Sequence, residues 1–187
     1  MNGLISLMPD FLHEEVLKIW KDLDILFGLN RVKSTLYPHI TWVISQSCDE
    51  YEIIEWLEGE KKKHFPFNIK TNGIGIFTGK RPAIYIQVKQ NVELIKFQQH
   101  LYDKFSPQAK ELKKLYFPEN WIPHISLAIE DVNGNNISGV IEHLLPISFK
   151  HEIKITGISL VRRKKGENME IVKNFFFPDK NDLEAYA

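Results

Sequence analysis

Two short segments of the chain carry the same four-residue pattern, with a histidine in second place and a hydroxyl residue in fourth. One is Pro38-His39-Ile40-Thr41, the other is Pro123-His124-Ile125-Ser126, and each continues as an apolar run. Residues two apart in a strand point to the same face, about 6.6 to 6.8 Å from each other. Each motif therefore presents an imidazole and a hydroxyl on one face and turns its isoleucine to the opposite face.

These side chains are suited to acid–base chemistry at a phosphoryl group. Because an imidazole has an ordinary pKa of about 6.5, one ring of a pair can accept a proton while its partner donates one. Such help is worth roughly 10² to 10⁴ in rate per group. The hydroxyls of Thr41 and Ser126 can donate hydrogen bonds to oxygens that gain negative charge. We assign water activation to His124 and protonation of the leaving oxygen to His39, with the reverse order left open.

A single histidine beside an apolar strand is more often structural than catalytic, but the same pattern found twice favours catalysis. The sequence near the two motifs lacks the paired Asp and Glu residues that a magnesium or two-metal site uses, so we expect neither a metal nor a cofactor. The lone cysteine, Cys48, has no basic neighbour that would activate it. The remaining histidines are interpreted as surface or structural residues: His13, His64, His100, His143 and His151.

Four further residues are predicted to contact the substrate. Lys80 and Arg81 lie in a turn between two strand-like runs, where they either hold a phosphate or form a solvated hairpin tip. Tyr85 and Trp121 carry rings on which a base can stack, a contact worth about 1 to 3 kcal/mol per base. Core packing is the alternative for Tyr85, whereas the loop position of Trp121 predicts exposure. The basic run 162–165 is interpreted as a solvated surface.

Composition places these residues in a folded protein. The 187 residues are 43% hydrophobic and 26% charged, with 24 basic and 24 acidic side chains, so the chain has no overall attraction for polyanions. A single cysteine excludes an internal disulfide. No apolar run approaches the roughly 20 residues of a membrane span, and the first residues lack the basic region of a signal peptide. We therefore expect a cytoplasmic monomer that does not bind a membrane.

Hydrophobic periodicity predicts the elements that must position the motifs. Helices are expected over 11–27, with Asp10 as the N-cap and Gly28 as the stop, and over 49–63, 92–105 and 137–145. The region 106–122 is predicted to be a short helix followed by a loop. Strands are expected over 1–8, 37–45, 67–77, 83–89, 124–130, 153–163 and 169–177, the last two as a closing hairpin.

The order of these elements predicts an α+β fold. The half of the chain that begins at residue 83 repeats the order of the first half, which indicates one domain of two lobes over 1–187. We expect a core over about 3–177 and a loose tail over 178–187. A pseudo-two-fold axis between two antiparallel sheets backed by helices would direct both motifs into one central groove.

The paired motifs resemble those of the 2H phosphoesterase superfamily, which includes the LigT-like 2'-5' RNA ligases, also known as RNA 2',3'-cyclic phosphodiesterases. The resemblance rests on His39-Ile40-Thr41 and His124-Ile125-Ser126, on the strands 73–77 and 83–88, and on Trp121-Ile122-Pro123. It implies a bilobal α+β fold whose central groove is lined by both motifs. It also implies metal-independent hydrolysis or transfer at a phosphodiester, often a cyclic one, on RNA ends or nucleotides.

Two other kinds of function use the same groove. One is hydrolysis of cyclic oligonucleotide or dinucleotide signals, or of a cyclic phosphate derived from ADP-ribose. The other is binding of nucleotides or RNA ends without turnover, although the presence of all four motif side chains favours an enzyme. A structural adaptor would neither bind nor turn over such a ligand.

Overall fold

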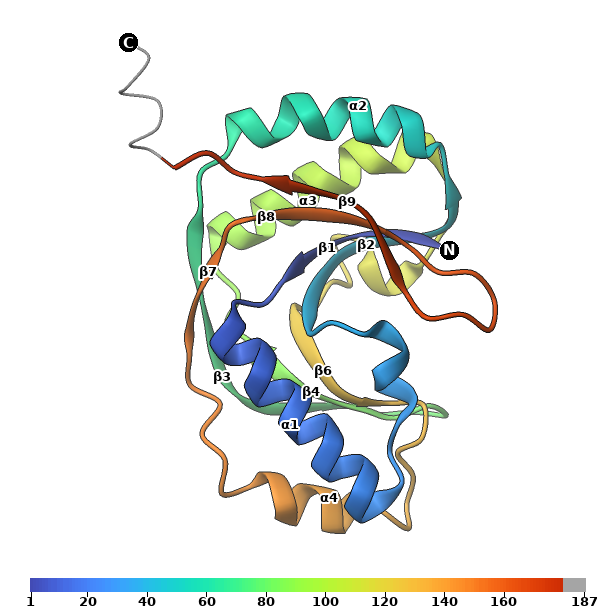
Figure 1. Ribbon diagram of the computed structural model, residues 1–187, viewed down its shortest axis with the longest axis vertical. Coiled ribbons are helices and arrows are strands. Elements are labelled where there is room, and N and C mark those ends of the chain that lie inside the picture. Colours follow the sequence, from blue (N-terminus) through green and yellow to red (C-terminus); the bar gives the residue numbers. More distant parts are fainter. Residues whose placement is uncertain (180–187) are drawn as a thin grey trace.

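A computed structural model describes residues 1–179 and confirms the α+β class (Figure 1). Most of the tail predicted to be loose, 178–187, lies outside the described residues. The strands are β1 (Asn2–Leu7), β2 (His39–Cys48), β3 (Phe67–Phe77), β4 (Ala83–Val88), β5 (Ala109–Leu112), β6 (His124–Ile129), β7 (Glu152–Ile155), β8 (Gly157–Arg162) and β9 (Glu170–Phe176). The α-helices are α1 (Asp10–Phe27), α2 (Glu50–Glu60), α3 (Val92–Phe105) and α4 (Ile137–Leu144).

The helix ends follow from capping residues. Pro9 takes the N-cap position of α1, so Asp10, predicted to be the cap, is instead the first residue of the helix. The helix ends where Gly28 takes the left-handed conformation, with φ of 71°, which a residue without a side chain adopts at little cost. The carboxylate of Asp49 accepts hydrogen bonds from the first backbone amides of α2, and Asn91 caps α3 in the same way. Within residues 1–179, no helix combines the length and the apolar character needed to cross a bilayer.

The strands form one curled sheet with two lobes. Its order is β7-β3-β4-β6-β2-β1-β8-β9, with β5 paired to β2, and every neighbouring pair is antiparallel. We call β6, β4, β3 and β7 the β6 lobe, and β2, β1, β8, β9 and β5 the β2 lobe. A single residue pair, Ile40 opposite Ile125, joins the two lobes.

The lobes are not the two halves of the chain, which corrects the division at residue 83. The β6 lobe takes β3 from the first half, while the last two strands, β8 and β9, join β1 and β2. The run 153–163 is likewise divided at Thr156, because β7 pairs with β3 and β8 pairs with β1. One extended segment thus reaches both lobes, so the sheet must curl (Figure 1).

Helices cover the outer faces of the sheet and enclose the core. Helix α1 packs on β6 and α4, whereas α3 packs on β2 and α2 contacts β9. A continuous cluster of buried side chains runs through both lobes and includes Ile40 and Ile125. The predicted short helix after residue 106 is wrong: two 3-10 turns flank strand β5, whose pairing with β2 supplies backbone partners that local sequence does not reveal.

Candidate active site

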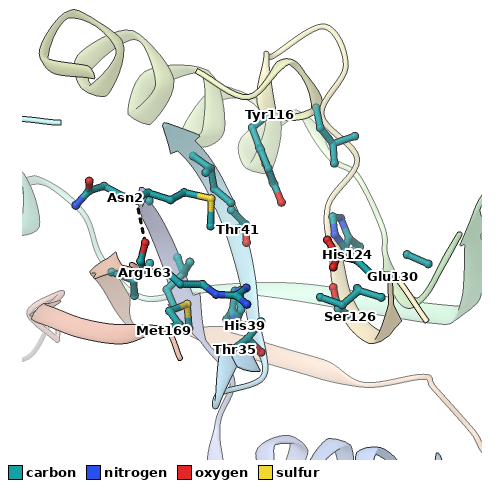
Figure 2. Close-up of a pocket in the computed structure, with 18 of the residues that line it drawn as sticks. Asn2, Thr35, His39, Thr41, Tyr116, His124, Ser126, Glu130, Arg163 and Met169 are labelled. Atoms are coloured by element: carbon teal, nitrogen blue, oxygen red, sulfur yellow. Dashed lines mark hydrogen bonds between the residues drawn. The ribbon is translucent and has the colours of Figure 1, made fainter. Parts of the chain in front are cut away.

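The pairing of β2 with β6 brings the two motifs together. Ile40 and Ile125 lie opposite each other and are fully buried. Because side chains alternate along a strand, the histidine and hydroxyl residue that flank each isoleucine face away from this core. His39, Thr41, His124 and Ser126 all line one cavity of about 340 Å³ (Figure 2). The groove predicted between the motifs is therefore present, and its volume suits a small ligand.

Both imidazoles are held in the same way. Nδ1 of His39 lies 2.5 Å from the carbonyl oxygen of Tyr37, and Nδ1 of His124 lies 2.7 Å from that of Ile122. The intervening proline restricts the residue before it to extended conformations, which sets the direction of each carbonyl. A carbonyl only accepts hydrogen bonds, so Nδ1 carries the proton in a neutral ring. Nε2 of each ring is then a free acceptor for a proton from the reactants.

The electrostatics of the cavity keep both rings neutral. Burial lowers the pKa of His39 to about 4; the hydrogen bond to Tyr37 opposes this shift and a charge on His124 would add to it. Burial also lowers the pKa of His124, again against its backbone hydrogen bond. A negative charge between the rings favours their protonated forms. Binding of an anion between the rings would therefore favour uptake of a proton by one of them.

Two tryptophans hold the backbone beneath the hydroxyl residues. The indole Nε1 of Trp121 donates to the carbonyl oxygen of Thr41 at 2.9 Å, and Nε1 of Trp20 donates to that of Ser126 at 3.0 Å. The first bond is buried, where a neutral hydrogen bond both stabilises and orients its partners. Trp121 is only 4% exposed, so its predicted exposure is wrong. The structure places its ring in the core, where it positions Thr41.

Tyr85 forms part of the wall behind His124. Its ring stacks on Phe77 with centroids 4.2 Å apart, and both rings contact the His124 imidazole, at 5.3 and 5.0 Å. Gly75 is required opposite this ring, because a Cβ there would lie 2.4 Å from the Tyr85 side chain. Phe77 lines the cavity and Tyr85 does not. Tyr85 therefore supports His124, and Phe77 is the aromatic ring that a ligand can meet.

Lys80 and Arg81 lie in the turn between β3 and β4, beyond the cavity wall. Both are exposed, and neither lines the cavity. Arg81 is 78% exposed and lies 3.5 Å from Glu130, which does line it. Arg81 thus reaches the rim of the site through Glu130, and neither predicted phosphate-binding residue lines the cavity.

Arg163 and Tyr116 line the cavity, although the sequence favours a solvated surface for Arg163 and core packing, with base stacking as the alternative, for Tyr116. Figure 2 shows the guanidinium of Arg163 extending toward His39 and the hydroxyl of Tyr116 pointing between Thr41 and His124. Nε of Arg163 donates to the carbonyl of Glu167 at 3.1 Å, and its backbone is bound to Met1 in both directions. The basic run 162–165 contained this residue, but charge alone does not distinguish a cavity arginine from a solvated one.

Solved structures share this fold. The chain aligns with TT0787 of Thermus thermophilus with a TM-score of 0.64 and 16% identity, over 96% of this chain and 98% of that one. E. coli LigT complexed with 3'-AMP gives a TM-score of 0.57 and 14% identity, over 95% and 98% of the two chains. At these identities the likeness establishes the fold: two lobes of antiparallel strands covered by helices.

A family model establishes the relationship. Residues 27–167, which contain both motifs and Arg163, match the 2'-5' RNA ligase superfamily. The chain belongs to this superfamily, as the motifs predicted. A comparison with curated proteins finds no match.

The low pKa of His39 predicts a pH-dependent stability. Between pH 6.5 and about 4 the unfolded chain binds a proton on this imidazole and the folded chain does not, so acidification favours unfolding. His39 should account for a loss of up to about 3 kcal/mol over this window. Urea unfolding of His39→Asn at several pH values should show a shallower loss than the parent protein, with His143→Asn as the control. Equal slopes in the parent and His39→Asn would contradict the burial of a neutral ring.

Proposed function

We propose that the protein is a metal-independent 2',3'-cyclic phosphodiesterase that acts on RNA ends or nucleotides and opens the ring to a phosphomonoester. The observation that carries this proposal is the pair of neutral imidazoles with free Nε2 atoms, which face one cavity together with two hydroxyls. Glu130 is the one carboxylate among the described lining residues, and it faces Arg81. The reactive groups are therefore those of acid–base catalysis by histidine.

The two pKa shifts suggest which histidine is the base. Burial lowers the pKa of both rings, and a charge on His124 lowers the pKa of His39 further. When the pair takes up one proton on His124, His39 therefore stays neutral, so we assign His39 to the water. His124 then carries the proton for the leaving oxygen. This order reverses the assignment made from the sequence. The negative charge of the bound phosphodiester raises the pKa of the imidazoles, so the pair takes up a proton when the substrate binds.

The reaction follows from these roles. His39 Nε2 removes a proton from water as the water oxygen forms a bond to phosphorus. The bond from phosphorus to one ribose oxygen breaks, and His124 gives its proton to that oxygen. Thr41, Ser126 and Arg163 can donate hydrogen bonds to the two non-bridging oxygens as their charge increases. Transfer of the proton from His39 to His124 through solvent restores the initial state.

The cavity favours a nucleotide-sized substrate. Its volume of about 340 Å³ is at the small end of ligand sites, and apolar side chains such as Ile5, Val161 and Met169 cover part of its wall. Phe77 offers an aromatic ring beside the reacting centre. A structure of the similarly folded E. coli LigT contains 3'-AMP, which supports a ribonucleotide or a terminal nucleotide as the occupant here.

Removal of either imidazole should abolish most of the turnover. We expect His39→Ala and His124→Ala each to reduce hydrolysis of 2',3'-cyclic nucleotides by at least about 100-fold. Activity should persist in EDTA, and His143→Ala, a substitution outside the cavity, should retain it. The measurement is product release, with cyclic nucleotides, RNA bearing a terminal cyclic phosphate and cyclic dinucleotides tested in parallel. Full activity in either cavity variant would overturn the mechanism, and binding without turnover would favour a binding module.

The assigned roles predict an acidic pH optimum for kcat/KM, which reports the ionisations of the free enzyme. His124 must be protonated, and because burial lowers its pKa below 6.5, kcat/KM should fall about tenfold per pH unit above that pKa. The rising limb should lie near the pKa of His39, about 4. In the pH profile of kcat/KM, the residual activity of His39→Ala should no longer rise with pH on the acidic side. The residual activity of His124→Ala should no longer fall as the pH increases. An optimum on the alkaline side of neutrality contradicts this scheme.

Arg163 should contribute to capture of the phosphate. A hydrogen bond to a charged group is worth about 1.5 to 3 kcal/mol, so Arg163→Ala should lower kcat/KM by about 10- to 100-fold. Lys165→Ala, in the same basic run but exposed, is the matched control and should retain the parent value. Measuring kcat/KM at two salt concentrations separates a local contact between Arg163 and the phosphate from a general electrostatic attraction of the substrate to the basic run. An equal loss in both variants would show that Arg163 has no specific contact.

A further inference from the structure

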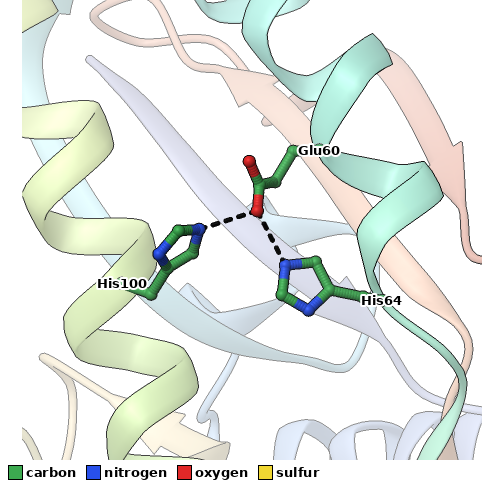
Figure 3. A group of neighbouring side chains, drawn as sticks. All are labelled: Glu60, His64 and His100. Carbon is green, nitrogen blue, oxygen red and sulfur yellow. Dashed lines mark hydrogen bonds and ion pairs between the residues drawn. The ribbon is translucent and has the colours of Figure 1, made fainter.

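A second cluster of ionisable side chains lies apart from the cavity of the two motifs. It consists of Glu60 at the end of α2, His64 just beyond it, and His100 on α3 (Figure 3). Oε1 of Glu60 lies 2.9 Å from Nε2 of His64 and 2.7 Å from Nε2 of His100. The three atoms all lie within 4.8 Å of one another. Both imidazoles thus point at one carboxylate oxygen.

The carboxylate at the centre of this cluster is buried and fixed. Glu60 is 2% exposed, which is rare for an acidic side chain without strong partners. Four side chains contact its two oxygens, His64, His100, Lys63 and Trp56, and replace the water that the buried carboxylate has lost. Trp56 Nε1 and Lys63 Nζ contact Oε2, at 3.0 and 3.2 Å, so Oε1 is left for the imidazoles. A charged, oriented carboxylate is therefore maintained there.

An open space lies beside the cluster. His64 and His100 line a second cavity of about 400 Å³, whose other walls include Phe67, Phe97 and Glu93. No residue is shared by the described linings of the two cavities. A ligand bound to the two imidazoles would thus remain accessible from solvent without contact with the proposed catalytic residues.

We propose that Glu60, His64 and His100 form a three-ligand site for a divalent transition-metal ion, with Zn²⁺ as the best fit and an open coordination position toward the second cavity. Two imidazole nitrogens and one carboxylate oxygen are a donor set that Zn²⁺ prefers, whereas Ca²⁺ and Mg²⁺ prefer oxygen alone. Trp56 supplies an outer hydrogen bond that orients a ligating carboxylate. The site differs from the proposed catalytic centre, where no such cluster of three donors is found among residues 1–179.

Binding requires small, local changes. Bonds of about 2.0 to 2.1 Å in a tetrahedral site separate the ligand atoms by about 3.3 Å, so each imidazole nitrogen must withdraw from Oε1 by about half an ångström. The two nitrogens, which lie within 4.8 Å of each other, must come to the same separation. Without the ion, Nε2 of each ring donates a proton to the Glu60 carboxylate, so on binding each ring must lose that proton, carry its remaining proton on Nδ1 and present the lone pair of Nε2. His64 and His100 lie at the surface and can move, while Glu60 is fixed. The ammonium of Lys63, 67% exposed, opposes the cation but is free to turn into solvent.

Such an ion would bind α2 to α3 and stabilise the folded state, since the unfolded chain lacks a preformed site. The test uses untagged protein freed of metal with EDTA. Titration with ZnCl₂ by calorimetry should give one ion per chain, and Zn²⁺ should raise the Tm. Co²⁺ as a substitute should give the visible absorption of a tetrahedral nitrogen and oxygen site.

Variants identify the ligands. His64→Ala and His100→Ala should each weaken Zn²⁺ binding by at least about 100-fold. The double variant His39→Asn and His124→Asn should bind as the parent does, because those rings lie in the other cavity. Lys63→Ala should bind more tightly, since it removes a competing cation. His100→Gln and circular dichroism show whether a loss reflects unfolding. Equal affinity in the parent and His100→Ala, or loss in the double variant, would overturn the proposal.

Discussion

The cavity depends on one strand contact, the pair of Ile40 and Ile125 that joins the two lobes. Because each isoleucine is the middle residue of its motif, burying both in the core turns both histidines to the opposite face. The ladder between β2 and β6 contains only this pair, so neighbouring backbone groups need other partners. The indole of Trp121 donates a hydrogen bond to the carbonyl oxygen of Thr41, and that of Trp20 donates to the carbonyl oxygen of Ser126. These bonds fix the two hydroxyl residues although few backbone hydrogen bonds connect β2 with β6.

The same geometry holds the two histidines in matching environments within one cavity. A backbone carbonyl holds each ring at Nδ1, and burial disfavours the charged form of both. Within residues 1–179, neither ring has a carboxylate partner that would hold it protonated, so a bound anion would favour the charged form. Binding and protonation are thus coupled by the low polarity of the cavity wall.

The sequence predicted the features that depend on local spacing. The alternation along His39-Ile40-Thr41 and its counterpart predicts the shared face on which the structure has all four side chains, and Gly28 ends its helix as predicted. Prediction failed where a strand distant in the sequence supplies the hydrogen-bond partner. Strand β5 forms because it pairs with β2. The run 153–163 is divided at Thr156 because its two ends pair with strands of different lobes. Local spacing also could not find Arg163, or Glu60 beside His100, because tertiary folding alone brings these residues to their sites.

Helix α3 connects the two clusters of histidines. His100 contributes to the second cluster, while Gln98, two residues earlier and 1% exposed, donates to the carbonyls of Trp42 and Tyr116 at 3.1 and 3.0 Å. Tyr116 lines the cavity of the two motifs, and Trp42 directly follows Thr41. A buried amide is costly unless it is bonded, so Gln98 fixes α3 relative to β2. An ion held by His100 would therefore act on the position of the helix that supports one wall of the candidate active site.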